Sequence, residues 1–312
     1  MMKPTNIILD TDLGSDCDDV MALAYLAYAE RQGRAILRAV TLSNGCPDAE
    51  GALRALLSSL CAPPVRIGYA PPSVKCYDHY CAATVGCFGT PEPAYPRESA
   101  VRVLRRALLE GDRAVLVGIG PFTNLAALLE STGDDLSPLD GRALVGERCE
   151  RIVLMGGTFV EDAASKSPEW NAKLDPVATK TVLEGSPVDV AVVPYEVGVD
   201  MITGGEIMRR YGEEIPLSLA FCRFPRTGEL GGRHSWDPAT VLYAVEGCRE
   251  FFAESPRGRI TVDGAGRTLF SEDANGKARY VTLSEEASGG VEQKKRTAAY
   301  LDACALALLE SI

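Results

Sequence analysis

The sequence predicts an α/β protein in which helices flank a mainly parallel central sheet. Short apolar runs of β-like composition alternate with helical patterns along most of the chain, an order typical of βαβ units. Polar clusters follow several of these runs, and in open parallel sheets ligands bind beyond the carboxyl ends of the strands. We identify no internal repeat or linker, so we expect one domain over residues 1–312.

The first half of the chain begins this alternation. An apolar run at residues 6–9 is followed by a helical pattern that includes Val20, Leu23 and Leu26 and ends near the charged residues 30–34. We expect further strands at residues 36–42, 65–68 and 114–118, and helices at 49–60, 98–109 and 123–129.

The second half continues the alternation and then changes character. We expect strands at 152–155 and 188–193, a helix at 176–184, one or two hairpins within 260–282 and an amphipathic helix at 291–312. The proline and glycine content of residues 91–97 and 225–233 predicts loops.

The overall charge argues against nucleic acid as a partner. The chain carries 32 basic and 43 acidic residues, for a formal net charge of −11, whereas nucleic-acid binding needs clustered Lys and Arg. The first residues lack the features of a signal peptide, and no apolar stretch approaches the roughly 20 residues that span a bilayer. We therefore expect a cytoplasmic protein that binds neither nucleic acid nor membranes.

Ten cysteines are spread along the chain without a C-x-x-C pair. The closest group, Cys76, Cys81 and Cys87, lacks the spacing of zinc ligands. We expect free, buried thiols with no metal or disulfide role.

Residues 10–19 read D-T-D-L-G-S-D-C-D-D and hold five carboxylates. Charges packed so closely repel one another unless a cation or hydrogen bonds offset them, and ligation by carboxylate oxygens favours Ca²⁺ or Mg²⁺. Gly14 permits the tight turn of such a loop. Asp18 and Asp19 taken singly also suit a helix start, where acidic residues cap the helix. The whole cluster predicts a metal or catalytic site.

The segment I-I-L-D-T-D-L-G-S-D-C-D-D-V-M-A-L resembles the N-terminal signature of the inosine–uridine nucleoside hydrolase family, D-x-D-P-G-x-D-D. Leu13 stands in place of the usual proline, and the loop has two extra residues before the final aspartate pair. The resemblance implies a nucleoside hydrolase-like fold with an open Rossmann-like core.

The same resemblance implies roles for the aspartates of this loop. Asp12 would bind calcium and deprotonate the attacking water, and Asp19 would be the bidentate calcium ligand. Asp18 would bind a ribose hydroxyl, a role for which the insertion makes Asp16 a rival.

Three later segments resemble further motifs of the family. The run V-G-I-G-P-F-T-N-L-A is similar to G-P-L-T-N-L-A, which implies that Thr123 offers a backbone carbonyl to calcium; Thr123 or Asn124 also suits a helix cap. I-V-L-M-G-G resembles a strand and turn of the family. P-E-W-N resembles A-E-F-N, which implies that Glu169 and Asn171 bind ribose hydroxyls, together with Asn44.

The segment S-W-D-P-A-T-V-L-Y-A-V resembles H-D-P-x-x-V-x-Y and implies that Asp237 completes the calcium site. Trp236 stands where the family usually has His, which suggests stacking on a purine base, although a core aromatic is the alternative. Further pocket candidates are an aromatic ring of the loop 77–80 (Tyr77, His79 or Tyr80) and the pair Tyr195 and Glu196, which follows the strand expected at 188–193. His234, two residues before Trp236, is a candidate acid.

Together these motifs predict a Ca²⁺-dependent hydrolase that cleaves the N-glycosidic bond of a ribonucleoside, with Trp236 favouring purines and Asp12 as the base. By resemblance we expect a homodimer or homotetramer. Two alternatives stay open: an aspartyl phosphatase of the dehalogenase type, which also begins with a strand and D-x-D, and a catalytically weak ribose- or nucleoside-binding protein on the same fold.

Overall fold

A large sheet runs through the protein in the computed structural model, which describes residues 3–71, 74–159, 167–284 and 290–312. The strands are β1 (Thr5–Thr11), β2 (Ala35–Leu42), β3 (Arg66–Tyr69), β4 (Glu98–Ser99), β5 (Ala114–Gly118), β6 (Cys149–Met155), β7 (Val190–Val193), β8 (Ile202–Thr203), β9 (Arg233–His234), β10 (Phe252–Glu254), β11 (Gly258–Val262), β12 (Thr268–Glu272) and β13 (Ala278–Leu283). The helices are α1 (Asp18–Arg31), α2 (Ala49–Ser59), α3 (Cys81–Phe88), α4 (Ala100–Leu109), α5 (Thr123–Glu130), α6 (Gly141–Arg148), α7 (Trp170–Leu174), α8 (Pro176–Gly185), α9 (Tyr195–Gly198), α10 (Gly205–Tyr211), α11 (Pro216–Arg223), α12 (Thr227–Leu230), α13 (Trp236–Glu246) and α14 (Val291–Leu309).

The strand order is β12-β11-β13-β7-β6-β5-β1-β2-β3-β4, with β10 paired to β13. Every pairing from β13 through β4 is parallel, and only the pairs that involve β10, β11 and β12 at one end are antiparallel. This is the α/β fold with a mainly parallel central sheet that the alternation predicts. Strands β8 and β9 form a separate two-stranded sheet.

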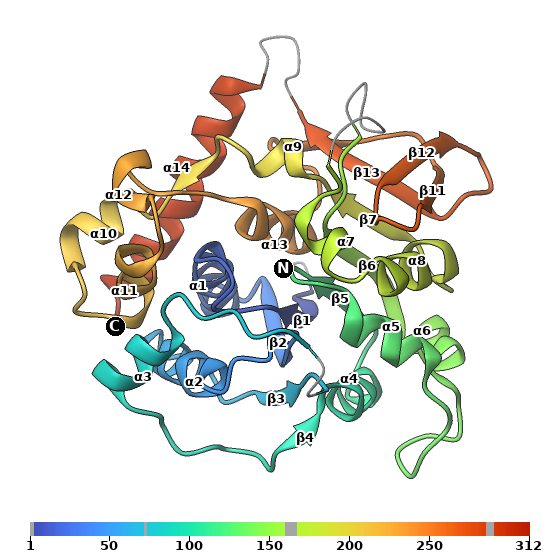
Figure 1. Ribbon diagram of the computed structural model, residues 1–312, viewed down its shortest axis with the longest axis horizontal. Helices are drawn as coiled ribbons and strands as arrows, with labels where there is room; N and C mark the ends of the chain where they lie inside the picture. Colours follow the sequence, from blue (N-terminus) through green and yellow to red (C-terminus); the bar gives the residue numbers. More distant parts are fainter. Residues whose placement is uncertain (1–2, 72–73, 160–166, 285–289) are drawn as a thin grey trace.

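The central strands are buried on both faces, so their side chains divide between two cores. In β1, Ile7 and Leu9 enter one hydrophobic cluster and Ile8 enters the other, as the alternation of a strand requires. Buried residues of α1, α2, α11, α13 and α14 fill the first cluster, and those of α4, α5, α6 and α8 fill the second. Figure 1 shows α1, α11 and α14 on one side of the strands and α5, α6 and α8 on the other.

Most predicted elements are present with shifted ends. Strand β1 runs to Thr11 instead of residue 9, so Asp10 lies inside the sheet and Asp12 follows it directly. Residues 91–97 form the predicted loop, and the predicted hairpin region holds β11 and β12. The loop predicted at 225–233 is partly wrong, because it contains α12 and the start of β9. The short helices α6 and α7 were not expected, since five to eight residues give too little periodicity.

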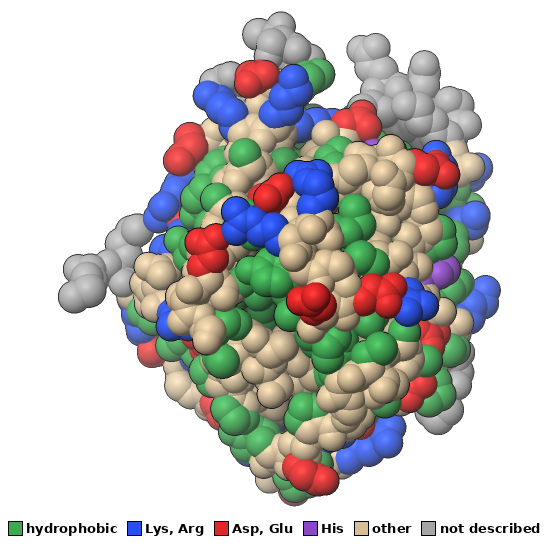
Figure 2. Space-filling view, turned by 90° about the vertical axis from the view of Figure 1, so that its left-hand side faces the viewer, with side chains coloured by type: hydrophobic (Ala, Val, Ile, Leu, Met, Phe, Trp, Pro, Cys, Tyr) green, Lys and Arg blue, Asp and Glu red, His purple; other side chains and the backbone are tan. Residues whose placement is uncertain are grey.

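Charges on the surface are largely paired. On the face shown in Figure 2, basic and acidic side chains are intermixed. The ion pairs of the protein include those of Arg210 with Glu206 at 3.0 Å and with Glu310 at 2.6 Å. Among the helices of the described residues, not one combines the length and the apolar character needed to cross a membrane.

Helix α14 is joined to the start of α10 by a partly buried carboxylate. The Asp302 side chain accepts a hydrogen bond from the Gly204 N–H at 2.8 Å, and burial raises the pKa of Asp302 to about 6. In an unfolded chain the pKa is about 3.9. The folded state therefore favours the protonated form, and the contribution of this group to stability declines as pH rises through about 6.

We predict that Asp302→Asn, which keeps the hydrogen-bond acceptor and removes the partly buried charge, stabilises the protein by about 2 kcal/mol at pH 8. The gain should shrink to near zero at pH 4, where Asp302 is protonated. Urea unfolding of the variant and the parent protein at both pH values measures this, because other titrating groups cancel in the comparison. An equal effect at pH 4 and pH 8 would contradict it.

Candidate active site

Three carboxylates from two helix starts meet beside the end of β1. Asp18, Asp19 and Asp237 each direct one carboxylate oxygen to a common point, and these atoms lie within 4.8 Å of one another. All three residues are buried. Asp19 accepts a hydrogen bond from the Thr11 hydroxyl through Oδ1, while its buried Oδ2 has no hydrogen-bond partner among the described residues. An oxygen in that situation needs a partner.

Burial raises the pKa of Asp18, Asp19 and Asp237 well above the usual range, and raises that of Asp12 to about 7. Repulsion adds to this effect, since Asp12 and Asp18 both raise the pKa of Asp19. A bound divalent cation would reverse it by favouring the charged carboxylates. The donor set is oxygen only, the type that hard cations prefer. The site therefore fits a metal ion on its chemistry and on its unpartnered oxygen.

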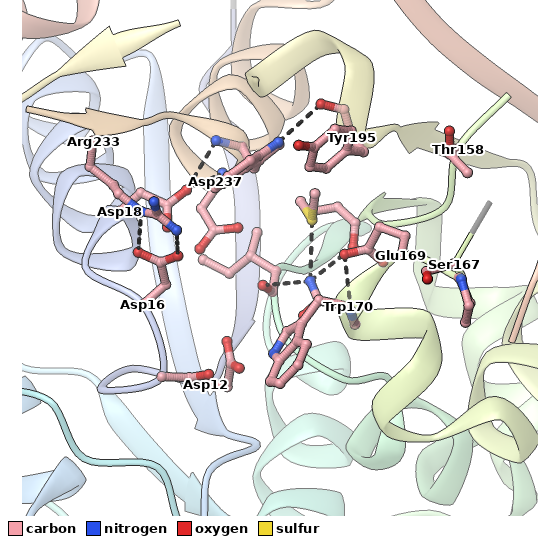
Figure 3. Close-up of a pocket in the computed structure, with 16 residues that line it drawn as sticks. Asp12, Asp16, Asp18, Thr158, Ser167, Glu169, Trp170, Tyr195, Arg233 and Asp237 are labelled. Atoms are coloured by element: carbon pink, nitrogen blue, oxygen red, sulfur yellow. Dashed lines mark hydrogen bonds and ion pairs between the residues drawn. The ribbon is translucent and has the colours of Figure 1, made fainter. Parts of the chain in front are cut away.

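A cavity of about 520 Å³ opens beside these carboxylates, a size typical of small-molecule sites. It lies at the carboxyl ends of β1, β5, β6 and β7, as expected for a parallel sheet. Figure 3 shows Asp12, Asp16, Asp18 and Asp237 on one side and Glu169, Thr158 and Ser167 on the other. The lining residues are Asp12, Ser15, Asp16, Asp18, Ile119, Met155, Thr158, Ser167, Pro168, Glu169, Trp170, Asn171, Tyr195, Arg233, Trp236 and Asp237.

Asp16 and Asp18 have different partners, which separates their roles. Asp16 forms a two-point ion pair with Arg233, including an Nε–Oδ1 contact of 2.8 Å (Figure 3). Asp18 Oδ2 accepts hydrogen bonds from the backbone N–H groups of Trp236 and Asp237, both at 3.0 Å. Asp18 thus caps the start of α13 from another helix, and the guanidinium of Arg233 holds Asp16 at the cavity wall.

Glu169 and Asn171 line the cavity from the short helix α7. Glu169 begins that helix and accepts hydrogen bonds from the N–H groups of Asn171 and Ala172 at 2.9 and 3.1 Å, and from Gly157 N–H at 3.2 Å. Burial raises the pKa of Glu169 to about 7. The Asn171 amide nitrogen donates to the carbonyls of Ile119 and Met155, at 3.1 and 3.2 Å. Both side chains are therefore fixed in place.

Aromatic rings form the rest of the wall. Trp236 stacks on Tyr195, with ring centroids 5.5 Å apart, and its indole N–H donates to the Tyr195 carbonyl at 3.0 Å. Trp170 is half exposed and contacts the Tyr77 ring edge-on at 5.9 Å. The predicted core role for Trp236 is thus only partial, because one part of the side chain packs and another lines the cavity.

Asn44 and Thr123, which were predicted at the site, lie outside the cavity lining, as does Asp19. Asn44 binds backbone only: its amide nitrogen donates to the carbonyls of Leu13 and Tyr77, at 2.9 and 2.6 Å, and its oxygen accepts from Tyr77 N–H at 2.9 Å. Thr123 begins α5, where its carbonyl turns into the helix, and its hydroxyl donates to Asp175 at 2.7 Å. Both side chains join separate segments of the chain, and their contacts with a ribose or a cation stay predictions.

The four remaining pocket candidates, His79, Tyr80, Glu196 and His234, also have other partners. His79 is exposed and packs on Phe224 at 5.0 Å, and Tyr80 is buried, with its hydroxyl accepting the Gly14 N–H at 3.0 Å. Glu196 accepts hydrogen bonds from the Thr158 hydroxyl and the Phe159 N–H, both at 2.6 Å. His234 lies behind Trp236, where its Nδ1 accepts the Asp200 N–H at 2.9 Å and burial lowers its pKa.

Sequence reasoning missed several lining residues. Ile119 was overlooked because a backbone carbonyl leaves no trace in residue type, although it stands in the same motif as Thr123. Arg233 was assigned to a loop, and its proximity to Asp16 requires two segments more than 200 positions apart. Thr158 directly follows the two glycines of I-V-L-M-G-G, and Trp170 directly follows Glu169 of P-E-W-N. Their places beside these motifs were the available signal.

Comparisons with known proteins identify a family for this chain. Residues 7–303 match the family described as inosine-uridine preferring nucleoside hydrolase. A relative, the pyrimidine-specific ribonucleoside hydrolase RihA of Shewanella sp. (strain MR-7), is 30% identical over 273 residues that cover 78% of each chain.

Solved structures share the fold. An inosine-uridine preferring nucleoside hydrolase from Bacillus anthracis superposes with a TM-score of 0.67 at 17% identity, covering 99% of this chain and 100% of the other. A purine-preferring ribonucleoside hydrolase from Gardnerella vaginalis gives 0.65 at 19% identity, covering 96% and 100%.

The contacts of Asn44 yield a prediction. Asn44→Ala leaves the backbone groups of Leu13 and Tyr77 without these partners, so we expect a loss of roughly 2–4 kcal/mol in the free energy of unfolding. Chemical denaturation measures it, with the exposed Asn275→Ala as a matched control of little effect. Unchanged stability together with a raised KM for a nucleoside would restore the ribose-binding role instead.

Proposed function

The chain belongs to the inosine-uridine preferring nucleoside hydrolase family and is an N-glycosyl hydrolase, and from this we propose that it hydrolyses a ribonucleoside to ribose and free base in the acidic cavity. The observation that carries the proposal is the convergence of Asp18, Asp19 and Asp237 within 4.8 Å at the edge of that cavity. Asp12 lines the same cavity and supplies the base that hydrolysis requires.

We propose Ca²⁺ as the metal, held by Asp19 and Asp237, whose carboxylates lie within 4.8 Å of each other and of Asp18, together with Asp12 from the adjoining cavity wall. The large, flexible oxygen coordination of Ca²⁺ suits a cluster of carboxylates from separate segments. The carbonyl ligand that the family resemblance assigns to Thr123 is better supplied by Ile119, which lines the cavity. When bound, the cation supplies a fixed positive charge that orients the attacking water.

Asp12 takes a proton from that water while the water oxygen attacks the anomeric carbon of the ribose. The C–N bond breaks, and its electron pair leaves with the base, through an oxocarbenium-like sugar. Buried carboxylates around the sugar stabilise the positive charge that develops. Calcium lowers the pKa of water less than zinc does, so a carboxylate close to the proton is essential.

Glu169 and Asn171 are suited to bind the ribose hydroxyls. Their hydrogen bonds to the backbone hold them before the substrate arrives, which reduces the entropy lost on binding. Polar groups positioned for hydroxyls reject sugars that lack them. We therefore propose that the enzyme discriminates against 2′-deoxyribonucleosides, with Asp16 or Asp18 as a further contact.

The base is proposed to lie against the aromatic wall of Trp170, Tyr195 and Trp236. Trp236 stacks on Tyr195, and the sequence also suggested a ring of the loop 77–80 on the other side of the base. Two fused rings stack over more area than one, so we propose a purine preference, although the relative RihA is named for pyrimidines. The base leaves with a proton from water, because His234 lies outside the cavity lining.

We predict that the purified protein with Ca²⁺ releases ribose from ribonucleosides, and that Asp12→Asn lowers kcat about 10³-fold. Chelation should abolish the activity and Ca²⁺ should restore it. A reducing-sugar assay measures ribose, with the surface variant Asp112→Asn as the charge-matched control. Tight nucleoside binding without ribose release would favour the weak binding protein, and phosphate release from a phenyl phosphate would favour the phosphatase.

The aromatic wall gives a second prediction. Trp236→Ala should lower kcat/KM for inosine about 10- to 100-fold, since stacking on a base contributes about 1–3 kcal/mol. The loss for uridine should be smaller. Steady-state kinetics on both nucleosides, with Trp170→Ala in parallel, measures it. Equal losses on inosine and uridine, or a parent enzyme that prefers uridine, would contradict the purine preference.

A further inference from the structure

Two cysteines and an aspartate meet at a second place, apart from the acidic cavity. One ligand atom from each of Cys46, Asp78 and Cys81 lies within 4.8 Å of the others. Cys46 follows β2 and Cys81 begins α3, so the pair joins two segments 35 positions apart. Both thiols are buried, whereas Asp78 is exposed at the rim. None of these residues lines the acidic cavity.

A third thiol stands next to this group. The Cys76 side chain interacts with the Cys46 thiol. The expectation of buried thiols is wrong for Cys76, which is exposed on the loop that precedes α3, and also for Cys61 and Cys87. Its place at the surface lets Cys76 approach a bound ion from outside. Cys46, Cys76, Asp78 and Cys81 thus provide four donors, three of sulfur and one of oxygen, from two neighbouring loops.

The surroundings favour a thiolate at Cys46 but not at its neighbours: a hydrogen bond with Cys46 together with burial raises the pKa of Cys81, and burial raises that of Cys76. Cys81 is the first residue of α3, and the Ala49 N–H at the start of α2 donates to the Cys46 carbonyl at 3.2 Å. Helix starts carry partial positive charge that stabilises anions. In addition, a hydrogen bond from the Cys81 thiol lowers the pKa of Cys46. A thiolate at Cys46 is the state that binds soft metals.

We propose that Cys46, Cys81 and Asp78, completed by Cys76, form a structural zinc site. Zinc accepts sulfur together with oxygen and is four-coordinate in closed sites. With Zn–S of about 2.3 Å, tetrahedral ligand atoms lie roughly 3.5–4 Å apart, so the group contracts only slightly to bind. The acidic cavity offers oxygen alone, so the two sites select different metals by ligand chemistry.

The position of this site gives it a consequence for the cavity wall. The loop that holds Cys76 and Asp78 lies on the segment after β2: Gly45 N–H donates to the Lys75 carbonyl at 2.9 Å, and Asn44 holds both backbone groups of Tyr77. Tyr77 in turn contacts Trp170, which lines the cavity. Zinc would fasten this loop at its far side and so hold the Tyr77 ring against Trp170.

Cobalt titration of the full-length protein tests the proposal. The protein is reduced, stripped of metal and saturated with Ca²⁺, and Co²⁺ is added. We expect one equivalent to produce sulfur-to-cobalt charge-transfer absorption in the near ultraviolet together with the strong visible bands of tetrahedral cobalt. Zinc should remove both. Because carboxylates give no thiolate band, cobalt in the acidic cavity does not imitate this result.

Variants assign the ligands. Cys46→Ser and Cys81→Ser should abolish the thiolate band, whereas Cys76→Ser and Asp78→Asn should weaken cobalt binding at least tenfold. The last two positions are exposed, and the amide oxygen introduced by Asp78→Asn would still accept the N–H groups at the start of α3. These two variants therefore remain decisive if the buried ones fail to fold. Cys222→Ser and Asp19→Asn serve as controls that keep the band.

Two results would overturn the proposal. One is the absence of a thiolate band in folded, reduced protein. The other is a band that persists unchanged in Cys76→Ser and Asp78→Asn. If mass spectrometry of the unreduced protein also finds Cys46 in a disulfide with Cys76 or Cys81, the cluster is a redox pair and not a zinc site.

Discussion

Mutual repulsion among buried carboxylates is the constraint around which this end of the sheet is arranged. Asp12, Asp18, Asp19 and Asp237 are all buried, and the charges of the first three raise the pKa of Asp237. Helix starts, hydroxyls and backbone N–H groups offset part of that repulsion, but Asp19 Oδ2 keeps no partner among the described residues. A cation removes the remaining penalty, so the same charges that destabilise the folded chain make the site selective for a hard metal ion.

Local patterns were sufficient to predict the layers of the fold. Apolar runs that alternate with helical patterns predicted β1, β2, β5 and β6. Each run is continuous because a strand buried on both faces needs apolar side chains throughout. The acidic segment after β1 also predicted a metal or catalytic site, since so many carboxylates in one loop have few other uses. Short elements such as α6 and α7 were missed, because tertiary contacts and capping define them more than periodicity does.

Contacts between distant segments were what the sequence could not supply. The family resemblance implied that Asn44 binds the sugar, but it could not show that the amide also binds the backbone of two loops. The cysteines failed zinc-spacing rules because the rules assume ligands close in sequence, while Cys46 and Cys81 are brought together by the packing of α2 on α3. Arg233 beside Asp16 belongs to the same class of long-range pairing.

The bridge from Asp18 to α13 couples two parts of the cavity. One oxygen of Asp18 holds the N–H groups of Trp236 and Asp237, while the residue also belongs to the carboxylate cluster. Any shift of that carboxylate on cation binding therefore moves the backbone that carries the indole ring. Thermodynamic reciprocity then applies: if the cation raises the affinity for a nucleoside by some factor, the nucleoside raises the affinity for the cation by the same factor. At a low concentration of the cation, the substrate itself would then promote cation binding.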